Sequence, residues 1–180
     1  MRVSGRAAKP RTAREPESAQ AAYTEAVKRL ARQSQSRAAL RQRLLRVGYV
    51  EAAVDAALER AQGDGYLNDP EYAAALVRRR SRGRGYALIA QELRAKGIEE
   101  GTAGSALATV DPQVEAVEAL ALGRSLLAHR RLADRQALTG YIGPRLSRRG
   151  FSSGLVYRIC GLLGDEWEAS GRFDSLQKRD

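Results

Sequence analysis

The sequence is short of the residues that build disulfides and metal centres. It has one cysteine, Cys160, and one histidine, His129, so no intrachain disulfide can form and no cluster has metal-ligand spacing. The N-terminal residues lack the apolar core of a signal peptide, and no uncharged apolar run approaches the length of a membrane span. We therefore expect no bound metal, no membrane association and a cytoplasmic location.

Enzyme motifs are scarce as well. No glycine-rich loop ends in Gly-Lys-Ser or Gly-Lys-Thr, which argues against ATP hydrolysis by that route. The glycines of GRGYAL, residues 83–88, have neither the spacing nor the preceding strand of a nucleotide loop. Glu99 and Glu100 are sequence neighbours, which is poor geometry for two carboxylates that must flank a bond. We expect a protein that is not an enzyme and that needs no cofactor.

Positive charge, by contrast, is abundant. The 31 Lys and Arg against 21 Asp and Glu give a formal net charge of +10 and a pI of about 10.3, and arginine far outnumbers lysine. Such a surface attracts polyanions, with nucleic acid or an acidic protein groove as the leading partners. A solvated basic surface without a special partner is the alternative, but the arginines are clustered, which favours binding.

One local pattern occurs three times. Gly48, Gly97 and Gly150 lie 49 and 53 residues apart. Four residues before each glycine comes a leucine, and directly after it comes a large apolar residue: Leu44 and Tyr49, Leu93 and Ile98, Leu146 and Phe151. Each copy is followed by an apolar stripe at i, i+3, i+4 and i+7, typical of an amphipathic helix: Val54, Ala57, Leu58 and Ala61; Ala103, Ala106, Leu107 and Val110; Val156, Ile159, Cys160 and Leu163.

This pattern predicts a helix that stops at the glycine. Glycine adopts the left-handed conformation at C′ without strain, and the apolar residue after it packs back on the leucine. Asp69-Pro70 and Asp111-Pro112 indicate helix starts, with Asp as the N-cap and Pro at the first helical position.

We predict an all-α fold of three tandem three-helix repeat units that form an elongated, curved array. The units span roughly residues 18–65, 68–110 and 111–167. A disordered basic tail, residues 1–17, precedes them, and a polar C-terminal tail, residues 168–180, follows. Because neighbouring units can bury one another, we expect a monomer.

Residues 65–98, GYLNDPEYAAALVRRRSRGRGYALIAQELRAKGI, resemble the bacterial regulatory protein RecX family. The matching positions are Gly65 to Asp69, Tyr72, Ala73, the basic stretch from Arg78 to Arg84, Gly85, Ile89, Glu92, Leu93, Lys96, Gly97 and Ile98. Asn68 stands where the family more often has Asp. The resemblance extends to the helical repeat over residues 20–165, although the third unit matches only through its helix stop.

This resemblance implies a regulatory protein that is not an enzyme. Such proteins bind the RecA recombinase filament on single-stranded DNA, lie in its helical groove and inhibit its recombinase, coprotease and ATPase activities, thereby modulating DNA repair, recombination and the SOS response. The implied partners are RecA and single-stranded DNA, with double-stranded DNA as a further partner.

The residues expected to contact the filament or its DNA are basic. A dense run lies within residues 77–85, two cations follow it, and a second cluster lies in the third unit: Arg78, Arg79, Arg80, Arg82, Arg84, Arg94, Lys96, Arg145, Arg148 and Arg149. The alternative is a set of solvated helix ends, where cations also favour the helix dipole. For Glu92, an i,i+4 pair with Lys96 is favoured over a specific contact. For Tyr66, Tyr72 and Tyr86, core packing is favoured over base stacking.

A second hypothesis is a stand-alone DNA-binding protein, because compact three-helix units also resemble helix-turn-helix modules. A sequence reader of that kind usually works as a two-fold dimer, whereas these units are in tandem. Under either hypothesis, DNA binding should weaken steeply with salt.

Overall fold

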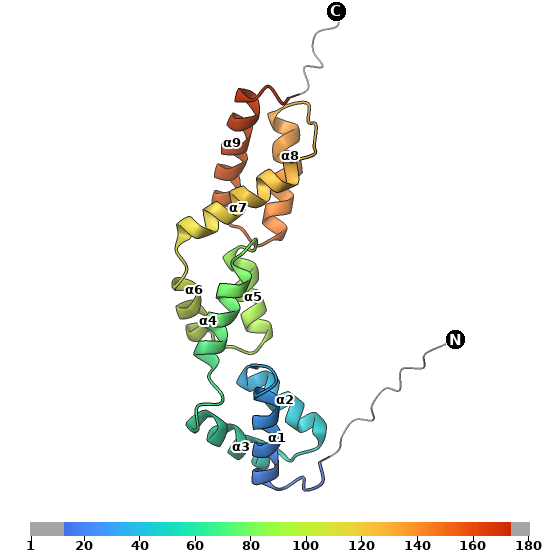
Figure 1. The fold of residues 1–180 in the computed structure, drawn as a ribbon, viewed down its shortest axis with the longest axis vertical. Helices are drawn as coiled ribbons and strands as arrows, with labels where there is room; N and C mark the ends of the chain where they lie inside the picture. Colours follow the sequence, from blue (N-terminus) through green and yellow to red (C-terminus); the bar gives the residue numbers. More distant parts are fainter. Residues whose placement is uncertain (1–12, 174–180) are drawn as a thin grey trace, which may run out of the picture. The chain divides into compact units, whose positions relative to one another are not determined.

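The computed structural model describes residues 13–173, and helices account for most of that range (Figure 1). One isolated bridge joins Leu132 to Phe173. The helices are α1 (Ala19–Leu30), α2 (Arg37–Val47), α3 (Glu51–Gly63), α4 (Asp69–Arg80), α5 (Tyr86–Ala95), α6 (Glu100–Ala108), α7 (Pro112–Leu127), α8 (Arg135–Arg148) and α9 (Ser153–Ala169).

The predicted tails fall mostly outside the described residues. Of the N-terminal tail, residues 13–17 are described, and they bond to the first helices: Ala13 donates its N–H to the Val47 carbonyl, and Val50 donates to the Pro16 carbonyl. At the other end, α9 continues to Ala169, inside the stretch assigned to the polar tail. Across the described range, no helix is both long and apolar enough to cross a membrane.

The described residues divide into two compact units. The first runs up to Tyr72 and also includes Lys96–Ile98, and the second consists of Ala73–Ala95 and the described residues from Glu99 onward. In the first unit, α1, α2 and α3 enclose a core of small and branched apolar side chains: Ala26, Leu40, Leu44, Val54, Leu58, Ala61 and Leu67.

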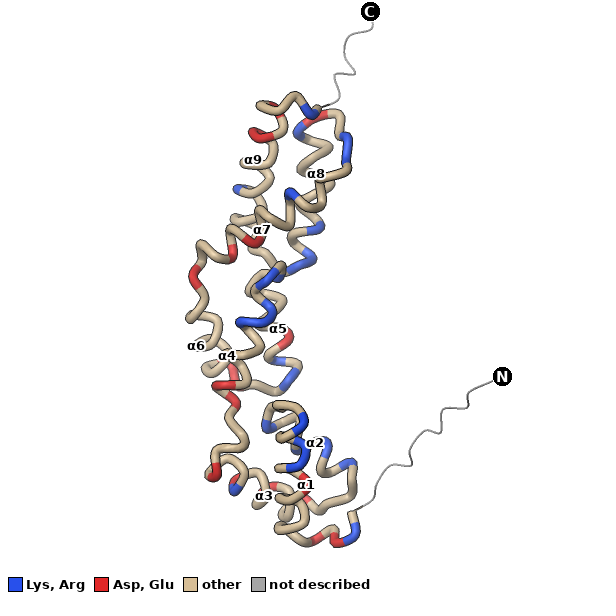
Figure 2. The backbone as a smooth tube through the Cα atoms, in the orientation of Figure 1, with Lys and Arg blue, Asp and Glu red and all other residues tan. Residues whose placement is uncertain are grey.

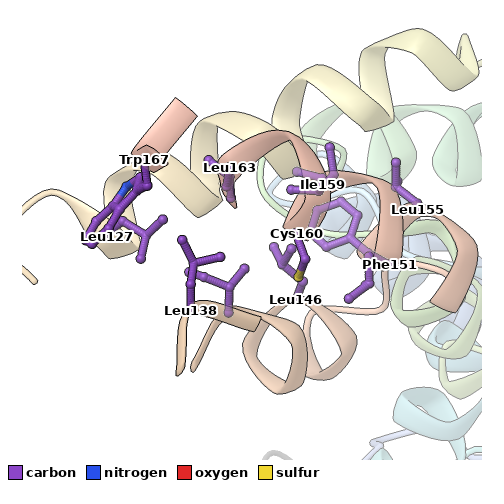
Figure 3. Close-up of a cluster of buried hydrophobic side chains, with 12 residues drawn as sticks. Leu127, Leu138, Leu146, Phe151, Leu155, Ile159, Cys160, Leu163 and Trp167 are labelled. Atoms are coloured by element: carbon purple, nitrogen blue, oxygen red, sulfur yellow. The ribbon is translucent and has the colours of Figure 1, made fainter. Parts of the chain in front are cut away.

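In the second unit, the larger core lies among α7, α8 and α9 (Figure 3). Trp167 and Phe173 meet there with ring centroids 5.6 Å apart, and Trp167 is 3% exposed. Cys160 lies in this core, and burial raises the pKa of its thiol. Cys160, a member of the predicted apolar stripe, is therefore a buried core residue. In the same unit, Leu76 of α4 and Ile89 and Leu93 of α5 are buried.

The predicted helix stops are confirmed. Gly48, Gly97 and Gly150 have φ of 103°, 72° and 86°, in the left-handed region. In the first and third copies, the residue after the glycine donates its N–H to the leucine carbonyl, Tyr49 to Leu44 at 3.3 Å and Phe151 to Leu146 at 3.4 Å. This is the 6→1 bond of a Schellman motif, which satisfies a carbonyl at the helix end.

One predicted helix start is wrong in detail. Asp111 caps α7 as expected, and its side chain accepts from the Gln113 N–H with Pro112 at the first turn. At α4, however, Asn68 provides the cap, because its side-chain oxygen accepts from the Glu71 N–H at 2.9 Å. Asn caps a helix as well as Asp does. Asp69 is then available to accept from the Arg37 N–H at 2.8 Å.

Candidate anion-binding surface

The loop of residues 81–85, between α4 and α5, is held in place by hydrogen bonds to its backbone. The Glu118 carboxylate accepts from the Gly83 N–H at 3.1 Å, and the Arg149 carbonyl accepts from the Gly85 N–H at 2.8 Å. At the start of α5, the Glu115 carboxylate accepts from the Tyr86 N–H at 2.9 Å. All of these residues belong to the second unit. The loop is thus positioned by α7 and by the end of α8.

The loop can approach α8 closely because glycines face each other there. A Cβ on Gly85 would lie 2.2 Å from the Gly150 carbonyl oxygen, and a Cβ on Gly150 would lie 2.5 Å from Leu88. Arg149 also reaches the loop and donates to the Gly83 carbonyl at 3.4 Å. The two arginine clusters were expected in different repeat units, but the structure brings them together where the loop meets the end of α8 (Figure 2).

Within the first cluster, the arginines differ in availability. Arg80 and Arg84 donate to the half-buried Glu92 carboxylate, at 2.7 and 2.9 Å. Arg78, Arg79 and Arg82 are exposed, and no carboxylate among the described residues pairs with them. These three side chains are therefore the ones that a phosphate or carboxylate can reach.

The second cluster is divided in the same way. The guanidinium of Arg145 lies 3.7 Å from the centroid of the Tyr141 ring and donates to the Tyr141 carbonyl at 2.7 Å. Arg148 and Arg149 are exposed, and each donates to a backbone carbonyl, Arg148 to Pro144 at 3.2 Å and Arg149 to Gly83 at 3.4 Å. We call the five exposed arginines the basic surface: Arg78, Arg79, Arg82, Arg148 and Arg149.

Arg94 and Lys96 are also exposed. Arg94 is in the last turn of α5, and Lys96 follows that helix. At 1.5 Å per residue, Arg94 lies about 12 Å along the helix from the loop. The structure therefore does not place Arg94 on the basic surface, and Lys96 belongs to the first unit.

The interpretation of Glu92 needs correction. The sequence favoured a modest surface pair with Lys96, one turn further along the same helix. The structure shows a carboxylate bonded to two arginines from α4 and the loop, and Glu92 is 18% exposed. Sequence spacing missed these partners because they come from the preceding helix and its connection.

The tyrosines also differ from one another. Tyr86 is half-buried and donates its hydroxyl to the Val110 carbonyl at 2.8 Å. Burial, followed by the nearby Glu115 and Asp111 carboxylates, raises its pKa. Tyr66 is 55% exposed, so core packing was the wrong expectation for that residue.

Sequence reasoning also missed Glu115 and Glu118, which position the loop. Both lie on α7, about 30 residues after the loop, and no local spacing connects them with its backbone. No group of His, Cys, Asp and Glu among the described residues could hold a metal ion. The guanidinium groups of the basic surface are the groups there that can bind an anion.

The sequence of this helical protein matches known family models and known relatives. Residues 22–60 match the family model described as RecX, first three-helix domain, and residues 68–107 match RecX, second three-helix domain. The chain is 35% identical to the regulatory protein RecX of Thermobifida fusca, over 79% of this chain and 76% of that one. It is 36% identical to the regulatory protein RecX of Halorhodospira halophila, over 82% and 91%.

Solved structures agree with the sequence relatives. A crystal structure of a regulatory protein RecX superimposes with a TM-score of 0.72 at 27% identity, over 78% of this chain and 72% of that one. RecX from Lactobacillus salivarius has the same fold, with a TM-score of 0.73 at 21% identity. The chain belongs to the RecX family of regulatory proteins.

Proposed function

We propose that this protein binds the RecA filament on single-stranded DNA and inhibits its recombinase, coprotease and ATPase activities, without catalysing a reaction itself. Membership of the RecX family supports a regulatory role, and the sequence resemblance implies RecA as the partner. The observation that carries the proposal is the basic surface, where the loop that follows the arginines of α4 contacts Arg149 at the end of α8.

The chemistry of the basic surface suits a nucleoprotein partner. A guanidinium presents a planar fork that fits a phosphate or a carboxylate in a bidentate manner. A filament offers both groups, on its DNA and on its protein. Because Arg78, Arg79 and Arg82 have no carboxylate partner within the described residues, they need not break an ion pair to bind.

We also propose that α7, α8 and α9 form a third copy of the three-helix unit, within the predicted bounds, in an elongated monomeric array. A recurring contact supports this. Ser36 donates its hydroxyl to the Lys96 carbonyl at 2.5 Å, and Gly85 donates its N–H to the Arg149 carbonyl. Ser36 and Gly85 lie 49 residues apart, and each accepting carbonyl directly precedes a helix-stop glycine.

The test is ATP hydrolysis by RecA on single-stranded DNA, measured while this protein is titrated in at near-physiological salt. Binding to bare DNA is measured in parallel. We expect inhibition at well below one protein per RecA-bound nucleotide triplet. Absence of inhibition together with tight, salt-sensitive binding to bare DNA would instead favour the stand-alone DNA-binding protein.

A further inference from the structure

The first unit has a cluster of cations of its own, formed by residues that do not belong to the basic surface. It surrounds a cavity of about 240 Å³ where α1 ends and α2 follows. Its cations are Lys28, Arg29, Arg32 and Arg43, and Glu25 is the one carboxylate that lines it. Figure 2 shows basic positions gathered around this end of α1 and α2. We call this cavity the α1–α2 pocket.

Comparison with the next three-helix domain shows what the α1–α2 pocket lacks. Gly48 and Gly97 lie 49 residues apart, and the same interval separates Arg43 from Glu92. In the second domain, Glu92 neutralises two arginines that come from the first helix and its connection. In the first domain, the position of that carboxylate is occupied by an arginine. The pocket therefore has no carboxylate at the position of Glu92, and its four cations face one carboxylate, Glu25.

Two buried polar atoms of the pocket lack hydrogen-bond partners among the described residues. Arg29 forms an ion pair with Glu25 at 2.8 Å through Nη2. Its Nε is buried and has no hydrogen-bond partner among the described residues. A buried N–H donor without a partner is costly, so an acceptor at this position stabilises the fold. Oε1 of Gln35 is also buried without a partner, and a protonated phosphate oxygen or a bridging water can donate to it.

We propose that the α1–α2 pocket binds a phosphate group, which takes the place that Glu92 occupies in the second domain. A water fills about 30 Å³ in the liquid, so the cavity has room for a phosphate and several waters. Arginine forks bind phosphate through charge-assisted hydrogen bonds, and Lys28 adds a point charge. The phosphate comes from a nucleic-acid backbone or from a free polyphosphate. This inference does not rest on the proposed inhibition of RecA.

The test is an NMR titration of the full chain, labelled with ¹⁵N, with inorganic pyrophosphate at low ionic strength. We expect saturable shifts of the Arg29 Nε–H signal and of the backbone amides of residues 28–35. Equal shifts across all basic segments of the chain, or no shifts, would overturn the proposal. A thymidine oligonucleotide then distinguishes the two sources. If it shifts the same signals and competes with pyrophosphate, the ligand is backbone phosphate, and otherwise the pocket takes a free polyphosphate.

The decisive variant is Arg43→Glu, which installs the carboxylate of the second domain. We expect affinity for pyrophosphate to fall about tenfold or more, because the new carboxylate occupies the cations and repels the ligand. The matched control is Arg46→Glu, which makes the same charge change on α2 but does not line the pocket. If both variants bind pyrophosphate equally, the pocket is not the site. Lys28→Gln provides a second, milder variant in case Arg43→Glu disturbs the fold.

Discussion

At the scale of single residues, internal carboxylates determine which arginine side chains are available to bind another molecule. Glu92 binds Arg80 and Arg84, whereas Arg78, Arg79 and Arg82 in the same run are exposed. Exposed ion pairs contribute little, but Glu92 is mostly buried and accepts from two guanidinium groups. We therefore infer that Glu92 stabilises the junction between α4 and α5, while the exposed arginines remain available for the proposed binding.

Replacing Glu92 tests this division. Glu92→Gln removes the charge that holds two arginines, and we expect the free energy of unfolding to fall by about 1–2 kcal/mol. Urea unfolding followed by circular dichroism measures the change. The control is Glu71→Gln, on an exposed carboxylate of α4, with an expected change within about 0.5 kcal/mol. Equal stability of the two variants would show that the Glu92 pairs do not stabilise the junction.

At the scale of elements, a helix-stop glycine has two functions. Gly150 needs its left-handed φ to end α8, and it also lets α5 approach, because a Cβ would collide with the backbone nitrogen of Leu88. Gly97 shows the same combination, since a Cβ there would lie 2.3 Å from Cβ of Ala38. The glycine thus terminates one helix and makes room for another.

Because Gly150 has both functions, we predict that Gly150→Ala strongly destabilises the protein. The strained φ and the overlap with Leu88 together should lower the free energy of unfolding by about 2–4 kcal/mol. Gly154→Ala is the control, because Gly154 lies in α9 with open space around the added Cβ. That variant should be neutral or more stable by less than about 1 kcal/mol. Thermal unfolding compares the two, and similar melting temperatures would contradict the close approach.

At the scale of the whole molecule, the sequence predicted the helices better than their contacts. Apolar spacing located the buried stripes at Val54, Leu58, Ile159 and Leu163, because helical periodicity is a local property. It could not pair Glu92 with α4, or Glu118 with the loop, because those contacts depend on how helices pack. The sequence also did not predict that the two arginine clusters lie close together. That proximity depends on the close approach of Gly85 to Gly150.

The net charge of +10 predicts how binding responds to salt. The logarithm of the affinity for single-stranded DNA should fall linearly with the logarithm of the salt concentration, because bound phosphates release counterions. If Arg79 and Arg82 each contact a phosphate, the variant with both changed to Glu should lower the slope by about 1.4, at about 0.7 per contact. Fluorescence anisotropy of a labelled oligonucleotide gives the slopes. An unchanged slope would show that these two arginines do not contact DNA phosphates.

The most direct test of the account compares two charge-matched variants as inhibitors of RecA. One carries Arg79→Glu and Arg82→Glu on the basic surface. The other carries Arg14→Glu and Arg158→Glu, at exposed positions without a carboxylate partner in the described part of the chain. The measurement is the concentration that halves ATP hydrolysis by RecA on single-stranded DNA. We predict a rise of about tenfold or more for the first variant, as expected for losing charge-assisted contacts, and little change for the second. Equal inhibition by both variants would contradict the assignment of the basic surface.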